Sequence, residues 1–160
     1  FLPDGFFRTG DLGIIEDGFV RIIGRKKEII VTIGGKNIAP VPIEAALEGG
    51  LIDQAIVVGD ERPYLVALLA PDITALTQRA ETEGWPGDVS DWVARQDLLT
   101  DVACIVEAAM ANFPRFEQIK KWTLLNSGFT EDKGMLTPTL KLKRSVIQSQ
   151  FADTINHLYI

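Results

Sequence analysis

The stretch GRKKEIIVTIGGKNIAP, residues 24–40, constrains the fold more than any other part of the chain. Two short apolar runs, 19–23 and 29–33, are rich in β-branched residues, and each predicts a strand. Three consecutive cations separate the runs, and a Gly-Gly pair marks a turn after the second run. Such a group of cations has two interpretations. It is either a solvated charged turn, or it marks an anion site or the boundary between two domains.

The rest of the chain mixes strand and helix patterns. Asp17-Gly18 between apolar runs predicts a hairpin over 14–23, and Pro42 suits the first position of a helix over 42–48. Further strands are predicted over 55–59, 64–70 and 120–125, and further helices over 72–83, 97–112 and 142–159. Hairpins dominate over regular βαβ alternation, so we predict an α+β fold. It has a small β-sheet flanked by helices and preceded by a separate N-terminal β-hairpin.

Charge and composition exclude several classes of protein. The net charge of −6 argues against a nucleic-acid-binding protein. No stretch approaches the roughly 20 apolar residues of a membrane span, and no signal-peptide pattern occurs. The single cysteine excludes an internal disulfide and fits a reducing compartment, so we expect a cytoplasmic protein. The chain begins without Met in a turn-rich segment, FLPDGFFRTGDLG, which indicates a fragment of a larger protein.

Two positions carry side chains suited to binding anions or hydroxyl groups. Lys141 follows the rigid segment 137–139 and precedes the last predicted helix, where a cation opposes the helix dipole. Such a lysine either decorates the start of the helix or reaches toward a phosphate or carboxylate. Asp11 lies in a turn, where it is either an ordinary turn former or a ligand for paired hydroxyls, as on a ribose.

Other reactive side chains have no partners that the sequence reveals. His157 has no second His or Cys nearby, so no metal-ligand spacing occurs. Cys104 is predicted to be a core thiol on or near the apolar face of its helix. The tryptophans are predicted to be packing residues: Trp85, Trp92 and Trp122. Neither GxxxxGK(S/T) nor GxGxxG occurs, so the chain shows no ATP-phosphate loop of its own.

Three segments together resemble the C-terminal part of acyl-adenylate-forming enzymes, and more narrowly of bacterial long-chain fatty-acid–CoA ligases. FFRTGDLG, residues 6–13, resembles the ribose-binding segment of that family. GRKKEIIVTIGGKNIAPVPIE, residues 24–44, resembles its hinge motif, and LTPTLKLKR, residues 136–144, resembles the motif that holds its catalytic lysine. The segments occur in the family's order, and the resemblance covers nearly the whole chain.

The resemblance implies roles for individual residues. Asp11 and Arg25 would hold the ribose of the adenylate, and Lys141 would be the catalytic lysine of adenylation. Lys27 would be the hinge between the end of an N-terminal adenylate-forming domain, residues 1–27, and a C-terminal lid domain, residues 28–160.

The resemblance also implies a path for CoA, along which the chain departs from its relatives. Gly34 and Gly35 would face the pantetheine, and an extra residue in this turn leaves open which of them matches the family glycine. Val31 stands where some relatives carry a lysine used in the thioester step, and Leu140 stands where many have glycine.

The implied reaction activates a fatty acid with ATP to acyl-AMP and pyrophosphate, and then transfers the acyl group to CoA. ATP, CoA and Mg²⁺ take part, with Mg²⁺ and most of the ATP bound by the chain's own N-terminal domain, so this fragment alone is expected to be inactive. Peripheral association of the full-length enzyme with a membrane stays open. The alternatives are an acyl-AMP ligase that loads a carrier protein, and a non-catalytic α+β interaction module.

Overall fold

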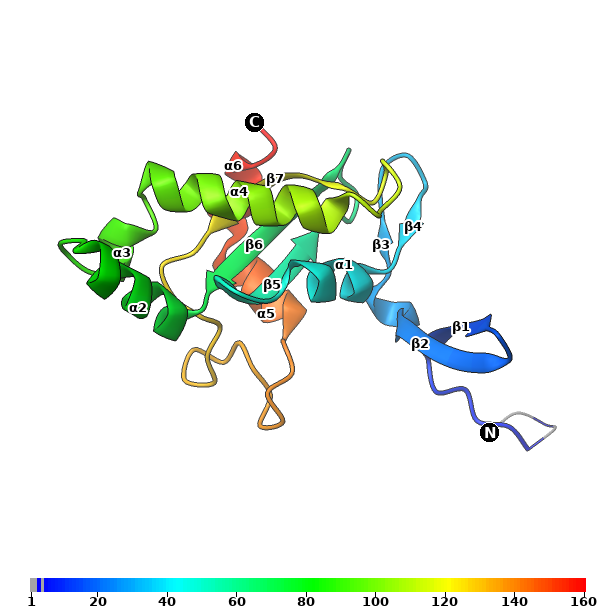
Figure 1. Cartoon of the computed structure of the whole chain (residues 1–160). Coiled ribbons are helices and arrows are strands. Elements are labelled where there is room, and N and C mark those ends of the chain that lie inside the picture. The colour runs from blue at the N-terminus through cyan, green and yellow to red at the C-terminus, as the bar shows by residue number, and fades with distance from the viewer. Residues whose placement is uncertain (1–2, 4) are drawn as a thin grey trace.

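The computed structural model describes residue 3 and residues 5–160, and it places a two-stranded hairpin beside a larger mixed body (Figure 1). The hairpin joins β1 (Asp11–Glu16) to β2 (Phe19–Arg25). Its turn residues Asp17 and Gly18 have φ of 52° and 82°, as a two-residue type I′ turn requires. The predicted N-terminal hairpin is confirmed, and it forms a sheet of its own.

Two short elements connect the hairpin to the body. The 3-10 helix η1 (Lys26–Glu28) follows β2 directly. The chain then forms a second, very short hairpin from β3 (Ile30–Val31) and β4 (Asn37–Ile38) before it enters α1 (Pro40–Leu47). Helix α1 thus begins at Pro40 rather than at Pro42, because the earlier proline takes the first helical position, where its missing N–H costs nothing.

A three-stranded sheet forms the centre of the body. β5 (Ile52–Val58) pairs antiparallel with β6 (Leu65–Pro71), which is buried along its whole length. β7 (Ile119–Leu124) pairs parallel to β6 on the other side. The antiparallel pair is the predicted hairpin, but the parallel pair corrects the expectation of hairpins alone, since parallel neighbours need a crossover. Three helices form that crossover: α2 (Ile73–Glu83), α3 (Val89–Trp92) and α4 (Gln96–Met110).

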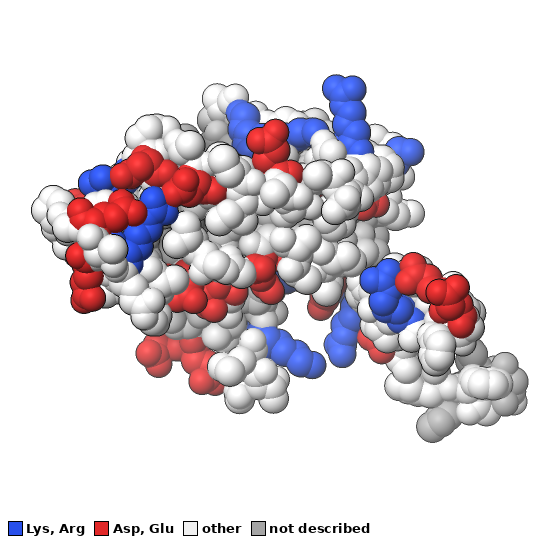
Figure 2. All heavy atoms as spheres, viewed as in Figure 1, with Lys and Arg blue, Asp and Glu red and all other residues white. Residues whose placement is uncertain are grey.

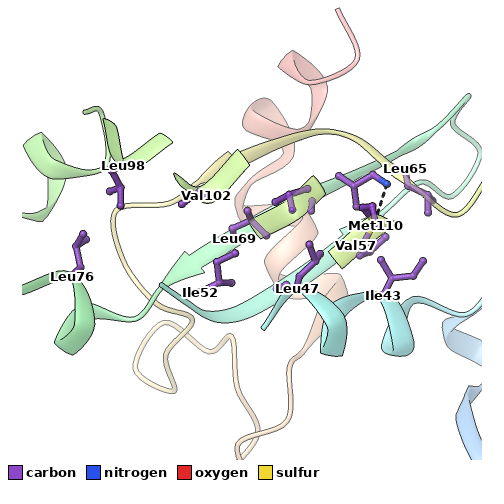
Figure 3. Packing of buried hydrophobic residues seen from close by; sticks show 14 of the residues in the cluster. Ile43, Leu47, Ile52, Val57, Leu65, Leu69, Leu76, Leu98, Val102 and Met110 are labelled. Carbon is purple, nitrogen blue, oxygen red and sulfur yellow. Dashed lines mark hydrogen bonds between the residues drawn. The ribbon is translucent and has the colours of Figure 1, made fainter. Parts of the chain in front are cut away.

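Helices cover both faces of the sheet, and the period-two alternation of the strands divides the core into two clusters. Val57 and Leu69 belong to the first cluster, together with residues of α1 and α4 (Figure 3). Ile56 and Leu68, one residue away in each strand, belong to the second, which includes residues of α5 (Arg144–Gln150) and α6 (Ala152–His157). This layered arrangement confirms the predicted α+β class.

The C-terminal segment differs from the single helix predicted over 142–159. Phe151, with φ −104° and ψ 22°, separates α5 from α6. Its ring meets Phe129 edge-on, with the ring centroids 6.3 Å apart. Ile147 and Ile155 lie on either side of the break and are both buried in the second cluster, so the bend lets both short helices face one core.

The surface of the body corrects one prediction and confirms another. Cys104 is exposed, because the buried face of α4 is taken by its neighbours Val102 and Val106. Trp85 is buried, and the other two tryptophans pack against the first cluster, as predicted. Figure 2 shows charges of both signs intermixed around α2, α3 and α4, where Arg79 pairs with Glu83 and Asp101. Among the described residues, no helix has the length and apolar character needed to cross a membrane.

Candidate functional site

A pocket of about 540 Å³ lies where the N-terminal hairpin meets the loop that precedes α5. The hairpin contributes Asp11 and Arg25 from its open end, and the loop contributes Lys141. The remaining lining residues are Ile22, Gly24, Glu28, Val41, Leu142 and Arg144. Three of the residues singled out from the sequence, which come from three separate motifs, therefore surround one cavity.

Asp11 and Arg25 face each other across the hairpin. They are Cα partners in the β1–β2 ladder, and Arg25 Nε lies 3.4 Å from Asp11 Oδ1. The Asp11 side chain is 30% exposed and the Arg25 side chain is 64% exposed. Asp11 is the first residue of β1 rather than part of a turn, as the sequence had suggested, and its backbone N–H donates to Thr9 Oγ1 at 3.1 Å just before the strand. The carboxylate keeps lone pairs directed to solvent, so it is able to accept hydrogen bonds from a pair of hydroxyls.

Lys141 sits in a closed loop that fixes its backbone and leaves its side chain exposed. Thr137 N–H donates to the Lys141 carbonyl at 2.8 Å, and Lys141 N–H donates to Thr137 Oγ1 at 3.0 Å. Leu140 takes a left-handed φ of 58° to make this turn. Within the described part of the chain, no carboxylate forms an ion pair with Lys141, so the ammonium is available to an anion in the pocket.

Lys27 lies in the middle of η1, between the hairpin and the body. It is exposed, and η1 contains no buried residue. On the hairpin side, the Lys26 N–H still donates to the Gly10 carbonyl at 2.8 Å, which extends the β1–β2 pairing up to this point. The chain thus leaves the hairpin through one short, solvent-exposed 3-10 turn, an element that commonly serves as a connector.

Gly34 and Gly35 lie apart from this pocket, in the turn between β3 and β4. Gly35 has φ 73°, and its N–H donates to the Thr32 carbonyl at 2.8 Å. Gly34 lines a different pocket, of about 370 Å³, whose cations are Lys36, Arg115 and Lys120. Lys36 Nζ also lies 5.2 Å from the centre of the Phe116 ring. The structure therefore does not bring Gly34 together with Asp11, Arg25 and Lys141, which line the first pocket.

A buried ion pair beside the first pocket escaped the sequence analysis. Arg144 Nη1 donates to Glu44 Oε1 at 2.5 Å, and its Nη2 donates to Glu44 Oε2. Burial opposes the charge on Arg144, but the bonds to Glu44 outweigh it, so the pKa of the guanidinium is raised. The sequence held one clue, because Glu44 lies next to Ile43 and three residues before Leu47, on the apolar stripe of α1.

The described residues do not form a metal site. No group of three or more His, Cys, Asp or Glu side chains converges among residues 3 and 5–160. The acids of the first pocket face cations instead, with Asp11 beside Arg25 and Glu28 beside Arg144. These side chains therefore do not fit as a Mg²⁺ site, and no chemical step at this pocket is assigned to that ion.

Comparisons with known proteins show the family to which this chain belongs. Residues 27–160 match the family model of the AMP-binding enzyme C-terminal domain. The chain is 44% identical to the long-chain-fatty-acid–CoA ligase FadD15 of Mycobacterium tuberculosis, over 98% of this chain and 27% of the relative. It is 33% identical to the long-chain-fatty-acid–CoA ligase ACSBG2 of Gallus gallus, over 98% of this chain and 23% of the relative.

The fold also matches a solved structure. The adenylation domain of a carboxylate reductase from Mycobacterium chelonae superimposes with a TM-score of 0.75 at 23% identity, covering 98% of this chain and 23% of that one. The chain belongs to the family of AMP-binding enzyme C-terminal domains. It spans about a quarter of the length of the curated relatives it matches.

Proposed function

We propose that this chain is the mobile C-terminal lid of a long-chain fatty-acid–CoA ligase. The observation that carries the proposal is the convergence of Asp11, Arg25 and Lys141 on one pocket. The fatty-acid–CoA ligase names of FadD15 and ACSBG2 support the reaction class. ATP phosphates, adenine and the acyl chain would be bound by the remainder of the complete protein.

We assign residues 1–27 to the end of the N-terminal domain and residues 28–160 to the lid, with Lys27 as the hinge. The separate hairpin and the exposed η1 support this division. The family match, which begins at residue 27, supports it as well. A rotation of the backbone at this point moves the body relative to the hairpin, and it breaks no buried contact within η1 because η1 has no buried residue.

In the first half-reaction, an oxygen of the fatty carboxylate attacks the α-phosphorus of ATP, and the bond to the β-phosphate oxygen breaks to release pyrophosphate. Asp11 accepts hydrogen bonds from the ribose hydroxyls, and Arg25 beside it holds the Asp11 carboxylate in place. Lys141 brings its ammonium to the phosphate oxygens and the incoming carboxylate, where negative charge builds up in the transition state. The fixed backbone of the Lys141 loop makes this a preorganised charge.

In the second half-reaction, the CoA thiol gives up its proton as its sulfur bonds to the acyl carbon, and the bond from that carbon to the phosphate oxygen breaks, so that AMP and the proton are released. Rotation at Lys27 removes Lys141 from the nucleotide and turns another face of the lid toward it, so one domain serves both steps. We assign the pantetheine path to the turn of Gly34 and Gly35, beside the pocket that contains three cations.

The test is to assay the complete protein with a long-chain fatty acid, measuring pyrophosphate release and acyl-CoA formation separately. We expect fatty-acid-dependent pyrophosphate release, acyl transfer to CoA, and no turnover by the 160-residue chain alone. Acyl transfer to a carrier protein in place of CoA would favour the carrier-loading alternative. Absence of fatty-acid-dependent pyrophosphate release would overturn the proposal.

A further inference from the structure

Arg144 connects three elements of the body through two carboxylates. Its guanidinium makes the paired hydrogen bonds to Glu44 in α1. Its Nε also lies 3.8 Å from Glu28 Oε2 in η1. Arg144 is itself the first residue of α5, so one side chain bridges the hinge segment, α1 and α5.

The two contacts differ in strength. The Glu44 side chain is only 7% exposed, and its Oε1 also accepts a hydrogen bond from the Val57 N–H of β5 at 2.8 Å. The Glu44 contact therefore anchors Arg144 to the central sheet. The Glu28 side chain is 37% exposed, and its contact with Arg144 is long. It therefore adds a weaker, solvent-screened attraction toward the hinge.

Arg144 is also coupled to the loop of Lys141. Only Leu142 and Lys143 separate the two residues, and the Lys143 N–H donates to the carbonyl of the buried Met135 at 2.8 Å. A β-bridge between Leu136 and Leu142 closes the same loop. The closed loop that contains Lys141 thus runs into Arg144 after only two residues, so the anchoring of Arg144 contributes to where the whole loop is held.

The position of Arg144 in its helix indicates that it is not there to stabilise α5. A cation in the first turn of a helix meets the positive end of the dipole, which is unfavourable. The two carboxylates offset that cost. One of them, Glu28, directly follows the hinge residue Lys27, and both Glu28 and Arg144 line the pocket that contains Lys141.

We propose that Arg144 is a positioning residue for adenylation: it fixes the Lys141 loop to Glu44 and to Glu28, so that rotation at the hinge places the lysine ammonium at the phosphate. The inference rests on the proposed function of Lys141 and Lys27. Because Lys141 leaves the site in the second half-reaction, the thioester step does not depend on this placement.

The test compares both half-reactions in the complete protein for Arg144→Lys and Glu28→Gln. Lysine keeps the charge but loses the planar fork that binds Glu44 in two places. A misplacement of about 1 Å lowers rates on the order of a hundredfold. We expect Arg144→Lys to lower kcat for acyl-AMP formation about ten- to a hundredfold, with the KM for ATP and the thioester rate from added acyl-AMP within about twofold of the wild type.

Glu28→Gln tests the hinge contact without disturbing the buried pair, so it remains informative if Arg144→Lys does not fold. We expect it to lower acyl-AMP formation severalfold and to leave the thioester step unchanged. Arg79→Lys is the matched control. The Arg79 side chain is similarly buried and also pairs with two carboxylates, but it belongs to α2 and does not line the pocket of Lys141. It should change neither step.

The outcomes separate this inference from the function on which it rests. If Lys141→Ala spares acyl-AMP formation, the proposed function fails. If Lys141→Ala abolishes acyl-AMP formation while Arg144→Lys and Glu28→Gln leave the ratio of the two half-reactions unchanged, Arg144 is only structural and the inference is overturned.

Discussion

Glu44 and Arg144 form a two-point ion pair between α1 and α5, although 100 positions separate them in the chain. The Glu44 carboxylate also accepts from the backbone of β5, so a single acidic side chain joins two helices and the sheet. A buried charge of this kind is costly unless every partner is present, because the protein interior cannot replace the lost hydration.

Removal of one partner should therefore be far more damaging than removal of both. We expect Glu44→Ala to lower the free energy of unfolding by about 3 kcal/mol, since it leaves Arg144 without its main partner and the Val57 N–H without an acceptor. The double variant Glu44→Met/Arg144→Leu should lose only about 1–2 kcal/mol, because it leaves no charge unpaired and only the Val57 N–H lacks an acceptor. Urea unfolding of the 160-residue chain measures both. Equal destabilisation by the single and double variants would contradict this account.

The fold was predictable where the signal is local. Asp17-Gly18 places the first hairpin, because a two-residue turn with positive φ admits few sequences. The parallel pairing of β6 with β7 was not predictable in this way, since either edge of the β5–β6 hairpin offers the same backbone groups. Cys104 was wrongly predicted to be buried. The apolar residues of α4 are compatible with two rotations of the helix that bury different residues, and packing on the sheet selects the one that leaves Cys104 exposed.

The site was predictable in part for a similar reason. Asp11 and Lys141 belong to short motifs, so the sequence alone was enough to propose each of them as a site residue. Their convergence on one pocket, and the separation of Gly34 into another, depend on how hairpin and body meet. No local pattern encodes the Glu44–Arg144 pair, which only tertiary packing brings together.

Leu140 is strained where a glycine would not be. Its φ of 58° is left-handed and the residue is 69% exposed, so leucine bears the steric cost without the gain of burial. We expect Leu140→Gly to raise the free energy of unfolding by up to about 1 kcal/mol. Glycine removes the steric cost of the left-handed conformation, but it also makes the unfolded chain more flexible, which offsets part of the gain. Gly134→Ala, at φ 70° with open space around it, is the reverse control and should lose about 1 kcal/mol. Thermal unfolding compares them, and a destabilised Leu140→Gly would show that the turn is not strained.

Lys141 should matter to one half-reaction only. We expect Lys141→Ala in the complete protein to lower acyl-AMP formation on the order of a hundred- to a thousandfold, as loss of a preorganised charge does. Formation of acyl-CoA from added acyl-AMP should remain within about threefold of the wild type, since the ammonium has left the site in that step. Lys143→Ala is the matched control, because Lys143 is exposed in the same segment but does not line the pocket. Equal loss of both half-reactions in Lys141→Ala would reject the assigned role.

Asp11 should act on nucleotide binding. We expect Asp11→Asn to raise the KM for ATP about ten- to a hundredfold, since hydrogen bonds to a charged acceptor contribute about 1.5–3 kcal/mol. Glu16→Gln, in the same strand but at the far end of the hairpin, should leave the KM unchanged. Initial rates at varied ATP concentration measure both variants. An unchanged KM in Asp11→Asn would place the ribose elsewhere.

Tyr159 makes the stability of the body depend on alkaline pH. Its hydroxyl donates to the carbonyls of Val58 at 3.1 Å and Tyr64 at 3.2 Å, which fastens the C-terminus to the β5–β6 turn. Burial raises the pKa of Tyr159 to about 12, against the partial opposition of the nearby Arg62 cation. The folded state therefore favours the neutral phenol more strongly than the unfolded chain does.

The sign of the pH dependence follows from that difference. Below the unfolded pKa of about 10, both states hold the proton and the stabilisation is fully present; as pH rises from about 10 to 12, the unfolded state loses its proton first and stability falls. We expect a loss of about 1–2 kcal/mol across this window in the wild type that is missing in Tyr159→Phe, which is less stable at neutral pH because it lacks the two hydrogen bonds. Urea unfolding at a series of pH values measures the difference between the two proteins, which cancels the titration of the lysines. Parallel pH profiles would show that the Tyr159 hydroxyl is solvated in the folded state.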